Sequence, residues 1–441
     1  MCSGVPVIKK GFILNVGPIA SYLYNVKDTM LKNVLLNNDA VNIFTKCDGL
    51  NSIDMISQDL SSEYGENFED IKNIVSSFIL NTNYFEILDE PEFRKVELTG
   101  FEDLQVPLHL LVELTDYCNY YCKHCFNDSS SNKNTFIDAD KLLSFLNEIS
   151  EMGVHTIDLS GGEPLNHPKF NEIVEFASKM FKKVTIISNG TLINKKHIDI
   201  FKKYKDKITL RLTLNSSTPD HMDDFCGKVG AFNKVMKIIP LLVKEGVNVE
   251  AAMNVTPFNQ DDIEDTLKLS MDLGCSKLEL GIISPMGRAM DNNELVFSDE
   301  EFFNFENEVN RIIEVYKDYI SKSEEYNAMS EINSGEFSLG NCGAGVKSIS
   351  ISPLGNAKLC PIDVNPYFTM GNVLNENLKD VLLRIGEFRF DKINKPQPMD
   401  CGSCDHLKFC QHCIVKGCIQ YKEIGNQCFW GEKYLKNQIT H

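Results

Sequence analysis

The cysteines are the residues that stand out for their chemistry, because they are clustered along the chain. The 441-residue sequence has 15 cysteines, of which three lie within Cys118–Cys125 and eight within Cys342–Cys428. The total is odd, and the first residues lack the basic, apolar and small-residue order of a secretion signal, so a disulfide framework is a weak interpretation. Clustered thiols in a cytosolic chain more often bind metal. We therefore expect a cytoplasmic metalloprotein.

The first cluster is a C-x3-C-x2-C motif made by Cys118, Cys122 and Cys125, directly after the apolar run Leu108–Leu114. Three thiolates on one short loop can bind three irons of a [4Fe–4S] cube, since each iron needs one cysteine. The fourth iron would then be open to a substrate or cofactor, as a catalytic cluster requires. A structural zinc site with one distant ligand is the alternative reading of the same spacing.

The second cluster lies in a cysteine-rich tail, residues 337–441. Its two C-x2-C pairs and several single cysteines fit structural zinc sites or iron–sulfur centres for electron transfer, and spacing alone does not choose between them. Its members are Cys342, Cys360, Cys401, Cys404, Cys410, Cys413, Cys418 and Cys428.

The elements that must position the first cluster are six alternating strands and helices between residue 105 and about residue 322. This alternation predicts an α/β fold with a parallel sheet, curved or open. The apolar, β-branched runs are Leu108–Leu114, Thr156–Leu159, Val184–Ile187, Ile208–Leu214, Val249–Val255 and Leu278–Ile283.

In parallel α/β sheets ligands bind at the carboxyl ends of the strands. Cys118 follows the first run, the segment Ser160–Pro164 (SGGEP) follows the second, and Ser188-Asn189-Gly190 follows the third. All three should therefore meet at one end of the sheet. The glycine pair of SGGEP lets backbone approach a ligand closely, and Glu163 supplies an acceptor for an ammonium group.

Residues 1–98 contain no cysteine cluster and form a separate front region. Short strand-like runs precede three helical segments, for which Asp39, Ser52 and Asn67 are the expected N-terminal caps. This order suits a small winged-helix-like domain. We expect three domains, with boundaries at 1–98, 99–322 and 323–441, and a last long helix of the core capped by Ser298 and Glu301.

Charge and hydropathy exclude some partners. The formal net charge is −18, from 44 basic and 62 acidic residues, so nucleic acid is a poor default partner. No run of about 18 uncharged apolar residues is present, so we expect no membrane-spanning helix.

The C-x3-C-x2-C motif followed by Gly-Gly-Glu-Pro resembles the radical SAM superfamily. The resemblance implies a partial (β/α)6 barrel in which Cys118, Cys122 and Cys125 hold a [4Fe–4S] cluster. The open iron would chelate the amino and carboxylate groups of S-adenosylmethionine (SAM). Its methionyl amine would be contacted by Gly161, Gly162 and Glu163.

Further SAM contacts are implied by the same resemblance. Ser188 and Asn189 lie where the family often places ribose or carboxylate contacts. Arg288 would lie near the SAM carboxylate, and His124 near the adenine. Relatives often carry Ser-Leu-Asp after the fourth strand and a later Arg-Gly, where this chain has Thr213-Leu214-Asn215 and Cys226-Gly227. Asn215 can still hydrogen-bond a ribose, but Cys226 cannot replace an arginine.

Beside a radical SAM core the tail resembles a SPASM domain, which carries two auxiliary [4Fe–4S] clusters. Cys342, Cys360 and Cys413 would then serve auxiliary cluster I. Cluster II would use Cys401, Cys404, Cys410 and Cys428. Either Cys418 completes cluster I or that cluster keeps an open iron. Cys2, Cys47, Cys226 and Cys275 match no family ligand.

The front region resembles the PqqD-like recognition element of peptide-modifying radical SAM enzymes. A leader peptide would add a strand beside its small sheet and pack against the third helix. A helical adaptor or a dimerisation domain is the alternative.

Across nearly the whole chain the resemblance is to the sactipeptide maturases of bacteriocin biosynthesis. It is carried by Asn341–Ile349, Phe409–Gly417 and Cys428-Phe429-Trp430. It implies an oxidoreductase-type enzyme that uses a 5′-deoxyadenosyl radical to join a cysteine sulfur to a carbon within one ribosomally made precursor peptide. A flavodoxin- or ferredoxin-type protein would donate the electron. The alternatives are another peptide modification, such as a carbon–carbon cross-link or a side-chain oxidation as in sulfatase maturation, and a non-catalytic, zinc-containing peptide-binding protein.

Overall fold

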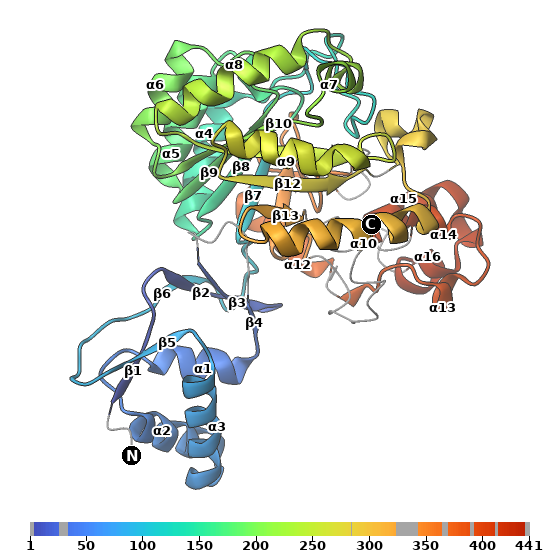
Figure 1. The fold of residues 1–441 in the computed structure, drawn as a ribbon. Coiled ribbons are helices and arrows are strands. Elements are labelled where there is room, and N and C mark those ends of the chain that lie inside the picture. The colour runs from blue at the N-terminus through green and yellow to red at the C-terminus, as the bar shows by residue number, and fades with distance from the viewer. Residues whose placement is uncertain are drawn as a thin grey trace. The chain divides into compact units, whose positions relative to one another are not determined.

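The computed structural model describes residues 4–25, 34–283, 285–322, 343–363, 369–388, 392–410 and 413–436. Two cysteines, Cys2 and Cys342, therefore lie outside the described residues. The contacts divide the chain into two compact units, Met1–Val106 and Pro107–His441 (Figure 1). Within the ranges above, no helix has both the length and the apolar character needed to cross a membrane.

The first unit contains two small sheets. In one, β1 (Val5–Ile8) pairs antiparallel with β5 (Phe85–Leu88). The other has the strand order β4-β3-β2-β6. Its strands are β2 (Phe12–Val16), β3 (Ser21–Asn25), β4 (Val34–Leu36) and β6 (Glu97–Gly100).

Three helices follow β4, namely α1 (Asn38–Lys46), α2 (Ile53–Tyr64) and α3 (Phe68–Asn81). Ser52 and Asn67 cap α2 and α3 as predicted. The predicted cap of α1 is wrong: the helix begins earlier, and Asn37 rather than Asp39 accepts the Ala40 N–H, at 2.9 Å. Asn and Asp cap helices about equally well, so the local sequence did not distinguish the two positions.

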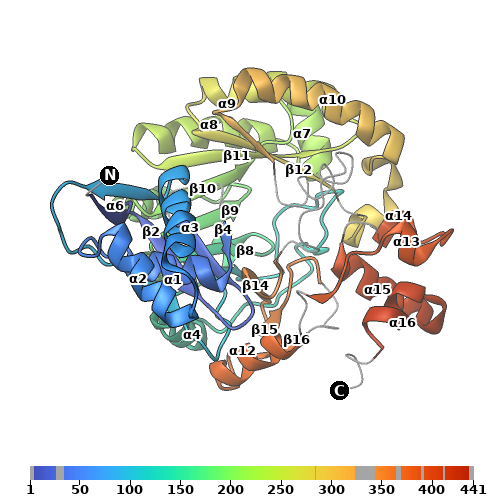
Figure 2. The ribbon, with the colours of Figure 1, turned by 90° about the horizontal axis from the view of Figure 1, so that it is seen from below.

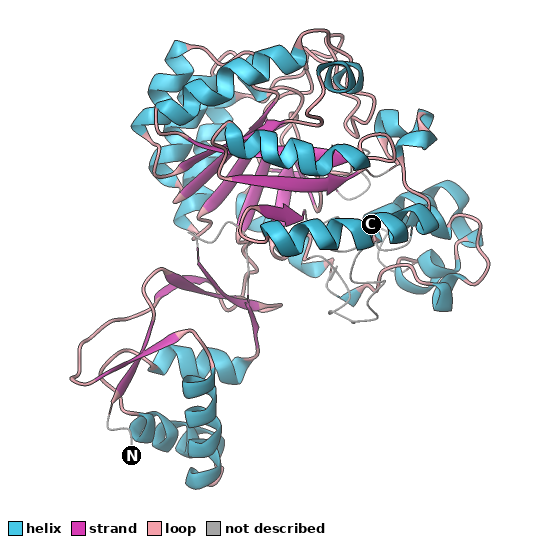
Figure 3. Cartoon of the chain, viewed as in Figure 1, coloured by secondary structure: helices cyan, strands magenta, loops and turns pink. Residues whose placement is uncertain are grey.

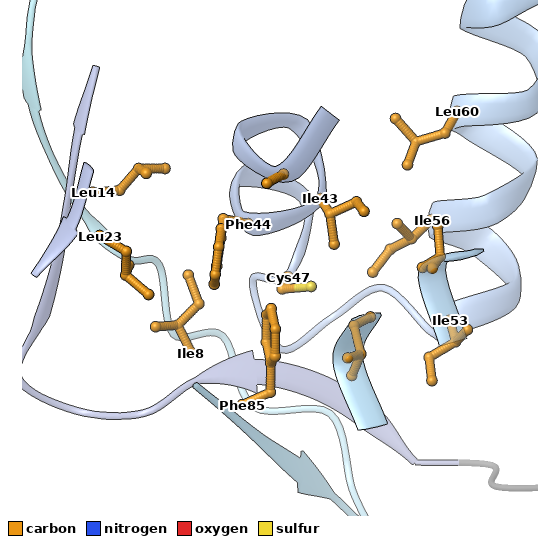
Figure 4. Close-up of a cluster of buried hydrophobic side chains, with 13 residues drawn as sticks. Ile8, Leu14, Leu23, Ile43, Phe44, Cys47, Ile53, Ile56, Leu60 and Phe85 are labelled. Atoms are coloured by element: carbon orange, nitrogen blue, oxygen red, sulfur yellow. The ribbon is translucent and has the colours of Figure 1, made fainter. Parts of the chain in front are cut away.

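The helices pack their apolar faces on the strands to form one core (Figure 4). Phe44 of α1 stacks on Phe85 of β5 with ring centroids 4.9 Å apart. Cys47 is buried beside both rings. This thiol is therefore part of the core, in agreement with its lack of a matching family ligand position.

The second unit is built on a ten-stranded sheet of order β13-β12-β11-β10-β9-β8-β7-β14-β15-β16. The strands from β7 to β13 pair in parallel with their neighbours. They are β7 (His109–Glu113), β8 (Thr156–Ser160), β9 (Lys183–Ser188), β10 (Ile208–Thr213), β11 (Asn248–Val255), β12 (Lys277–Ile282) and β13 (Ile320–Lys322). The predicted parallel α/β sheet is confirmed, and its curvature makes a partial barrel.

Helices connect the parallel strands and cover the outer face of the sheet (Figure 3). Ser298 and Glu301 form the predicted capping box of the last one. The helices are α4 (Ala139–Glu151), α5 (Phe170–Met180), α6 (Lys195–Lys203), α7 (Pro219–Cys226), α8 (Ala231–Lys244), α9 (Ile263–Asp272) and α10 (Asp299–Tyr316). Short 3₁₀ turns lie at η1 (Pro164–Asn166), η2 (Gln260–Asp262), η3 (Gly287–Asp291) and η4 (Asn293–Leu295).

The cysteine-rich tail continues the same sheet. Its strand β14 (Ser348–Ile351) pairs in parallel with β7, and β15 (Asn356–Lys358) and β16 (Thr369–Asn372) follow antiparallel. The helices are α12 (Leu378–Glu387), α13 (Pro398–Cys401), α14 (Leu407–Cys410), α15 (Ile414–Ile424) and α16 (Phe429–Tyr434), and Figure 2 shows α13–α16 gathered together.

A buried ion pair reinforces the junction between the tail and the barrel. The Nζ of Lys358, on β15, lies 3.1 Å from both carboxylate oxygens of Glu113, at the end of β7. Their side chains are 6% and 3% exposed. Lys358 also donates to the Pro361 carbonyl, 3.2 Å away. The start of the tail is thus tied to the strand that precedes the first cysteine motif.

Charged side chains also join neighbouring barrel strands. Arg211 of β10 pairs with Glu250 of β11 at 3.0 Å and with Glu279 of β12 at 3.1 Å. The Glu250 side chain is only 4% exposed, so Arg211 rather than water is its main polar partner.

We expect Arg211→Met to lower the free energy of unfolding by roughly 3–5 kcal/mol, because it leaves a buried carboxylate without its cation. The measurement is the urea midpoint followed by circular dichroism. Lys195→Met is the control: it breaks a surface pair with Asp199 and should change stability by less than about 0.5 kcal/mol. Equal midpoints for the two variants would contradict the assigned role of Arg211.

Candidate active site

The loop that carries the first cysteine motif is closed at its base by hydrogen bonds across about twenty residues. The Ile137 N–H donates to the Leu114 carbonyl at 3.0 Å. The Thr135 N–H and hydroxyl each donate to an oxygen of the Asp116 carboxylate, both at 2.7 Å. The loop therefore leaves β7 and returns to α4 as a fixed structure, which we call the cysteine loop (residues 114–137).

The three thiols of the motif lie close enough within this loop to interact electrostatically. Burial raises the pKa of Cys118 to about 12 and also raises that of Cys125. The pKa of Cys122 is raised by a hydrogen bond with the Cys226 side chain and by burial. Because their pKa values are raised, these thiols become thiolates only near a positive charge. Bound iron supplies that charge.

Across the described ranges, no group of three or more His, Cys, Asp or Glu side chains is arranged to hold a metal ion. A [4Fe–4S] cluster does not require such convergence, because each cysteine binds a different iron. Three neighbouring thiols on one loop, all buried or half-buried, are a donor set that fits a cluster of this kind.

The glycine pair after β8 lies directly against the cysteine loop. The Gly162 N–H donates to the Thr115 carbonyl at 2.6 Å, and the Glu163 N–H donates to the Tyr117 carbonyl at 2.8 Å. Gly161 has φ +129°, and a Cβ there would collide with the Thr115 carbonyl. A Cβ on Gly162 would collide with the Tyr117 carbonyl. The close approach that these glycines permit is thus to the cysteine loop itself.

Glu163 lies at the centre of the predicted SAM site and is almost fully buried. Its carboxylate accepts from the Ser188 hydroxyl and the Asn189 N–H, both at 2.8 Å, and from the Leu165 N–H at 3.2 Å. Burial nevertheless raises its pKa to about 7. A carboxylate has about four lone-pair sites, so one remains for an ammonium group, which would stabilise the ionised form.

Ser188 and Asn189 come together with Glu163 as predicted, and they also support it. The Asn189 side chain donates to Asn119 of the cysteine loop at 2.9 Å and accepts from the Thr191 N–H at 3.0 Å. The loop after β9 is therefore bonded both to Glu163 and to the cysteine loop. Sequence reasoning missed Asn119, which lies inside the C-x3-C step and could have been noticed there.

His124 is held by ring stacking and by one hydrogen bond. Its ring stacks on Phe225 with centroids 4.4 Å apart, and its Nε2 lies 3.2 Å from the Asn254 amide nitrogen. Burial and nearby Arg288 lower its pKa to about 4, so the ring is neutral at pH 7. With Nε2 accepting from Asn254, Nδ1 carries the proton. Nδ1 is buried without a partner among the described residues, which fits an acceptor atom of a bound ligand.

Asn215 is engaged inside the protein. Its side-chain oxygen accepts from the Asn254 N–H at 2.9 Å, and its amide donates to the Cys226 sulfur at 3.9 Å. It is fully buried in the loop after β10. The ribose contact implied by the resemblance stays a prediction for this residue. Asn254, at the end of β11, bridges His124 and Asn215 and was not identified from the sequence.

Arg288 is buried against the cysteine loop. Its Nε donates to the Cys122 carbonyl at 2.8 Å, and its Nη1 lies 2.9 Å from Asp128. Its guanidinium stacks 4.0 Å from the centre of the Tyr121 ring. The predicted contact with the SAM carboxylate remains a prediction, and the observed contacts hold the loop. Asp128 was missed from the sequence; it has φ +49°, which only the structure reveals.

A cavity of about 780 Å³ opens beside Tyr121 and the end of α7. Arg288 is the one residue predicted to contact SAM that the described lining includes, and Asn292 lies there with it. Asp220, Asp223, Asp224 and Asp291 give it an acidic wall. It is therefore separate from the environment of Glu163.

In the tail, the four cysteines predicted for auxiliary cluster II are brought together. The thiol of Cys410 interacts electrostatically with those of Cys428, Cys401 and Cys404, and burial raises its pKa to about 12. The Cys404 N–H donates to the Cys401 carbonyl at 3.1 Å, and the Gly431 N–H donates to the Cys428 sulfur at 3.3 Å. These ligand assignments remain predictions.

The set predicted for auxiliary cluster I is only partly described, because Cys342 lies outside the described residues. Cys413 is at the N-terminus of α15, and Cys418 is buried one turn further along. Burial raises the pKa of Cys418, and the next largest influences are Cys413 and Asp363. Asp363 follows Cys360 closely and donates its N–H to the Cys360 carbonyl at 3.1 Å. Cys418 therefore lies near Cys413.

Comparison with known proteins agrees with this geometry. Residues 112–270 match the family model of the radical SAM superfamily. The chain is 27% identical over 397 residues to the antilisterial bacteriocin subtilosin biosynthesis protein AlbA of Bacillus subtilis (strain 168), covering 89% of this chain and 84% of AlbA. It is 26% identical over 319 residues to the mycofactocin maturase MftC of Mycobacterium tuberculosis (strain ATCC 25618 / H37Rv), covering 70% of this chain and 78% of MftC.

Among solved structures, Streptococcus suis SuiB bound to its precursor peptide SuiA has a TM-score of 0.65 at 17% identity. The match covers 94% of this chain and 97% of SuiB. Such a likeness concerns the fold. Together with the parallel sheet and the match over residues 112–270, it shows that this chain has the α/β radical SAM fold, with a partial barrel of parallel strands.

Proposed function

We propose that this protein is a radical SAM enzyme that modifies a ribosomally made precursor peptide by forming intramolecular thioethers between a cysteine sulfur and a carbon atom. The observation that carries the proposal is the group of Cys118, Cys122 and Cys125, buried or half-buried on one loop, with Cys118 beside the buried carboxylate of Glu163. The similarity to AlbA, which is named for bacteriocin biosynthesis, and the peptide bound to SuiB support the substrate class.

The chain's own residues prepare the site for SAM. Glu163 holds the methionyl ammonium, and its raised pKa falls when that cation binds. The Nδ1–H of His124, which is buried without a partner among the described residues, would donate to the adenine. When bound together, the cluster and SAM supply the 5′-deoxyadenosyl radical. The buried surroundings exclude water from this reactive species.

The tail cysteines hold the two auxiliary [4Fe–4S] clusters, with the ligand sets given above. When bound, these clusters would supply a route for the surplus electron of thioether formation, and a flavodoxin- or ferredoxin-type protein would be the donor to the first cluster. The continuous sheet from β7 to β16 supports this arrangement, because it connects the tail to the barrel. We place the protein in the cytoplasm, where reducing conditions keep thiols available for iron.

The first unit recognises the leader of the precursor peptide. Strand β4 is at one end of its sheet order, so it can accept an added strand. Leu35 on β4, and Ile74 and Leu80 on α3, are exposed apolar residues that suit packing against such a peptide. A helical adaptor or dimerisation role for this unit is the alternative.

We expect Glu163→Gln to weaken SAM binding roughly 10- to 100-fold, because hydrogen bonds to charged groups contribute about 1.5–3 kcal/mol. Equilibrium dialysis under anaerobic conditions measures this affinity. Glu175→Gln is the control, since that carboxylate pairs with Lys203 at the surface. Equal affinities in the two variants would exclude Glu163 from SAM binding.

The raised pKa of Glu163, about 7, also predicts a pH dependence. The ammonium prefers the ionised carboxylate, and protonation of Glu163 increases as the pH falls through 7. SAM affinity of the unmodified protein should therefore decrease between pH 7.5 and pH 6. The decrease should be absent in Glu163→Gln, and a parallel decrease in both proteins would assign it to another group.

Incubation of the reconstituted enzyme with SAM, a reductant and its precursor peptide should remove two hydrogens from the peptide per thioether. Mass spectrometry after alkylation should show one blocked thiol for each bond. The Cys118→Ala/Cys122→Ala/Cys125→Ala variant should leave the peptide unchanged. Loss of two hydrogens with all thiols still alkylated would instead indicate a carbon–carbon cross-link or an oxidised side chain. Zinc without labile sulfide in the purified protein would indicate a non-catalytic peptide-binding protein.

A further inference from the structure

The loop after β9 contains a turn that is organised around the Asn189 side chain. The Thr191 N–H donates to the Asn189 side-chain oxygen at 3.0 Å, which is the arrangement by which asparagine closes a short turn. The Gly190 N–H, between them, donates to the Ser188 hydroxyl at 2.9 Å. The turn Ser188–Thr191 is therefore held in shape by hydrogen bonds among its own residues.

Three side chains close a ring of hydrogen bonds between this turn and the cysteine loop. The Asn189 amide donates to the Asn119 side-chain oxygen at 2.9 Å. The Asn119 amide donates to the Thr191 hydroxyl at 3.0 Å, and that hydroxyl donates to the Asn189 side-chain oxygen at 2.6 Å. Each side chain therefore donates to the next, and the last bond returns to the first residue.

The direction of all three bonds follows from one backbone group. The Thr191 N–H can only donate, so the Asn189 side-chain atom that faces it must be the oxygen. The Asn189 nitrogen then faces Asn119, whose oxygen must accept, and the Asn119 nitrogen is left to donate to the Thr191 hydroxyl. Hydrogen bonds that are connected in this way polarise one another, so the loss of one weakens the other two.

The ring is joined to Glu163 on one side, and the backbone of the cysteine loop is joined to it on the other. The Asn189 N–H donates to the Glu163 carboxylate at 2.8 Å, and the Glu163 N–H donates to the Tyr117 carbonyl at 2.8 Å. Tyr117 and Asn119 are the two chain neighbours of Cys118. The hydrogen bonds thus form a closed circuit from Glu163 through both neighbours of a predicted iron ligand. This circuit determines where the carboxylate lies relative to Cys118.

We propose that Asn119, Asn189 and Thr191 form a positioning ring that holds the Glu163 carboxylate where it receives the ammonium group of SAM. The inference rests on the proposed function and goes beyond it, because it gives a role to Asn119 and Thr191, which the SAM contacts implied by the sequence do not include. The Asn189 side chain belongs to the ring, and the residue acts on Glu163 through its backbone N–H. In this role none of the three side chains needs to touch SAM.

The test compares Thr191→Val with Thr191→Ser in the anaerobically reconstituted full-length protein. Valine has nearly the shape of threonine but no hydroxyl, so it breaks two bonds of the ring, whereas serine keeps them. Equilibrium dialysis should show SAM binding roughly 3- to 10-fold weaker in Thr191→Val, which is the scale of a lost hydrogen bond. Thr191→Ser should restore most of the affinity, and Asn119→Ala should resemble Thr191→Val. Asn147→Ala is the control, since it removes only an exposed bond to Glu151 within α4.

A double-mutant cycle shows whether the ring acts through Glu163. In a Glu163→Gln background, Thr191→Val should weaken SAM binding by less than about twofold, because the charge that the ring holds in place is already gone. An equally large loss of affinity in both backgrounds would overturn the proposal, in favour of a contact between Thr191 and SAM that does not involve Glu163.

Hydrogen–deuterium exchange detects the ring itself, in the absence of SAM. The amides of the turn Ser188–Thr191 should exchange faster in Thr191→Val than in the unmodified protein, and Thr191→Ser should restore the slower exchange. Unchanged exchange and unchanged SAM affinity in Thr191→Val would overturn the positioning ring. Loss of iron from Thr191→Val would also overturn it, in favour of a role in holding the cysteine loop. Failure of the unmodified protein to bind SAM would instead refute the proposed function, whatever the exchange rates.

Discussion

The close packing of the cysteine loop on the loop after β8 is the constraint on which the rest of the site depends. The carbonyls of Thr115 and Tyr117 accept hydrogen bonds from the N–H groups of Gly162 and Glu163. The same two carbonyls leave no room for a Cβ on Gly161 or Gly162. The same contact brings Glu163 close enough to Cys118 for the two groups to interact electrostatically. A single backbone interface therefore fixes both a predicted metal-binding segment and a predicted SAM-binding residue.

Burial at this interface is costly for ionisable groups. The pKa values of Glu163, Cys118 and Cys125 are raised mainly by burial, and that of Cys122 is raised by the Cys226 side chain and by burial, so all four groups are shifted toward their neutral forms. In the proposed enzyme, iron and a sulfonium-bearing amino acid restore the charged forms. The empty site is consequently less stable than the occupied one. Cofactor binding should therefore increase the free energy of unfolding of the barrel.

Much of the barrel could be predicted from sequence, because each parallel strand is a continuous apolar run between polar helices. The strand predicted at Val249–Val255 begins one residue earlier in the structure, at Asn248. The convergence of Cys118, Glu163 and Ser188 also followed from strand order alone. The side-chain partners could not be predicted in this way. The contacts of Asn254 and Arg288 join loops from different strands, and no local sequence pattern encodes such contacts. The cap of α1 was misplaced because two capping residues lie close together.

The pairing of β14 with β7 has a mechanical consequence for the tail. Their hydrogen-bond ladder and the Lys358–Glu113 ion pair fix the segment leading to Cys360 alongside the barrel's first strand. A hinge between barrel and tail at this point would have to break that ladder and expose a buried charge. The separation between the cysteine loop and Cys360 is thus set by the rigidity of one sheet, and in the proposed enzyme this rigidity would keep the distance between the two predicted cluster sites constant.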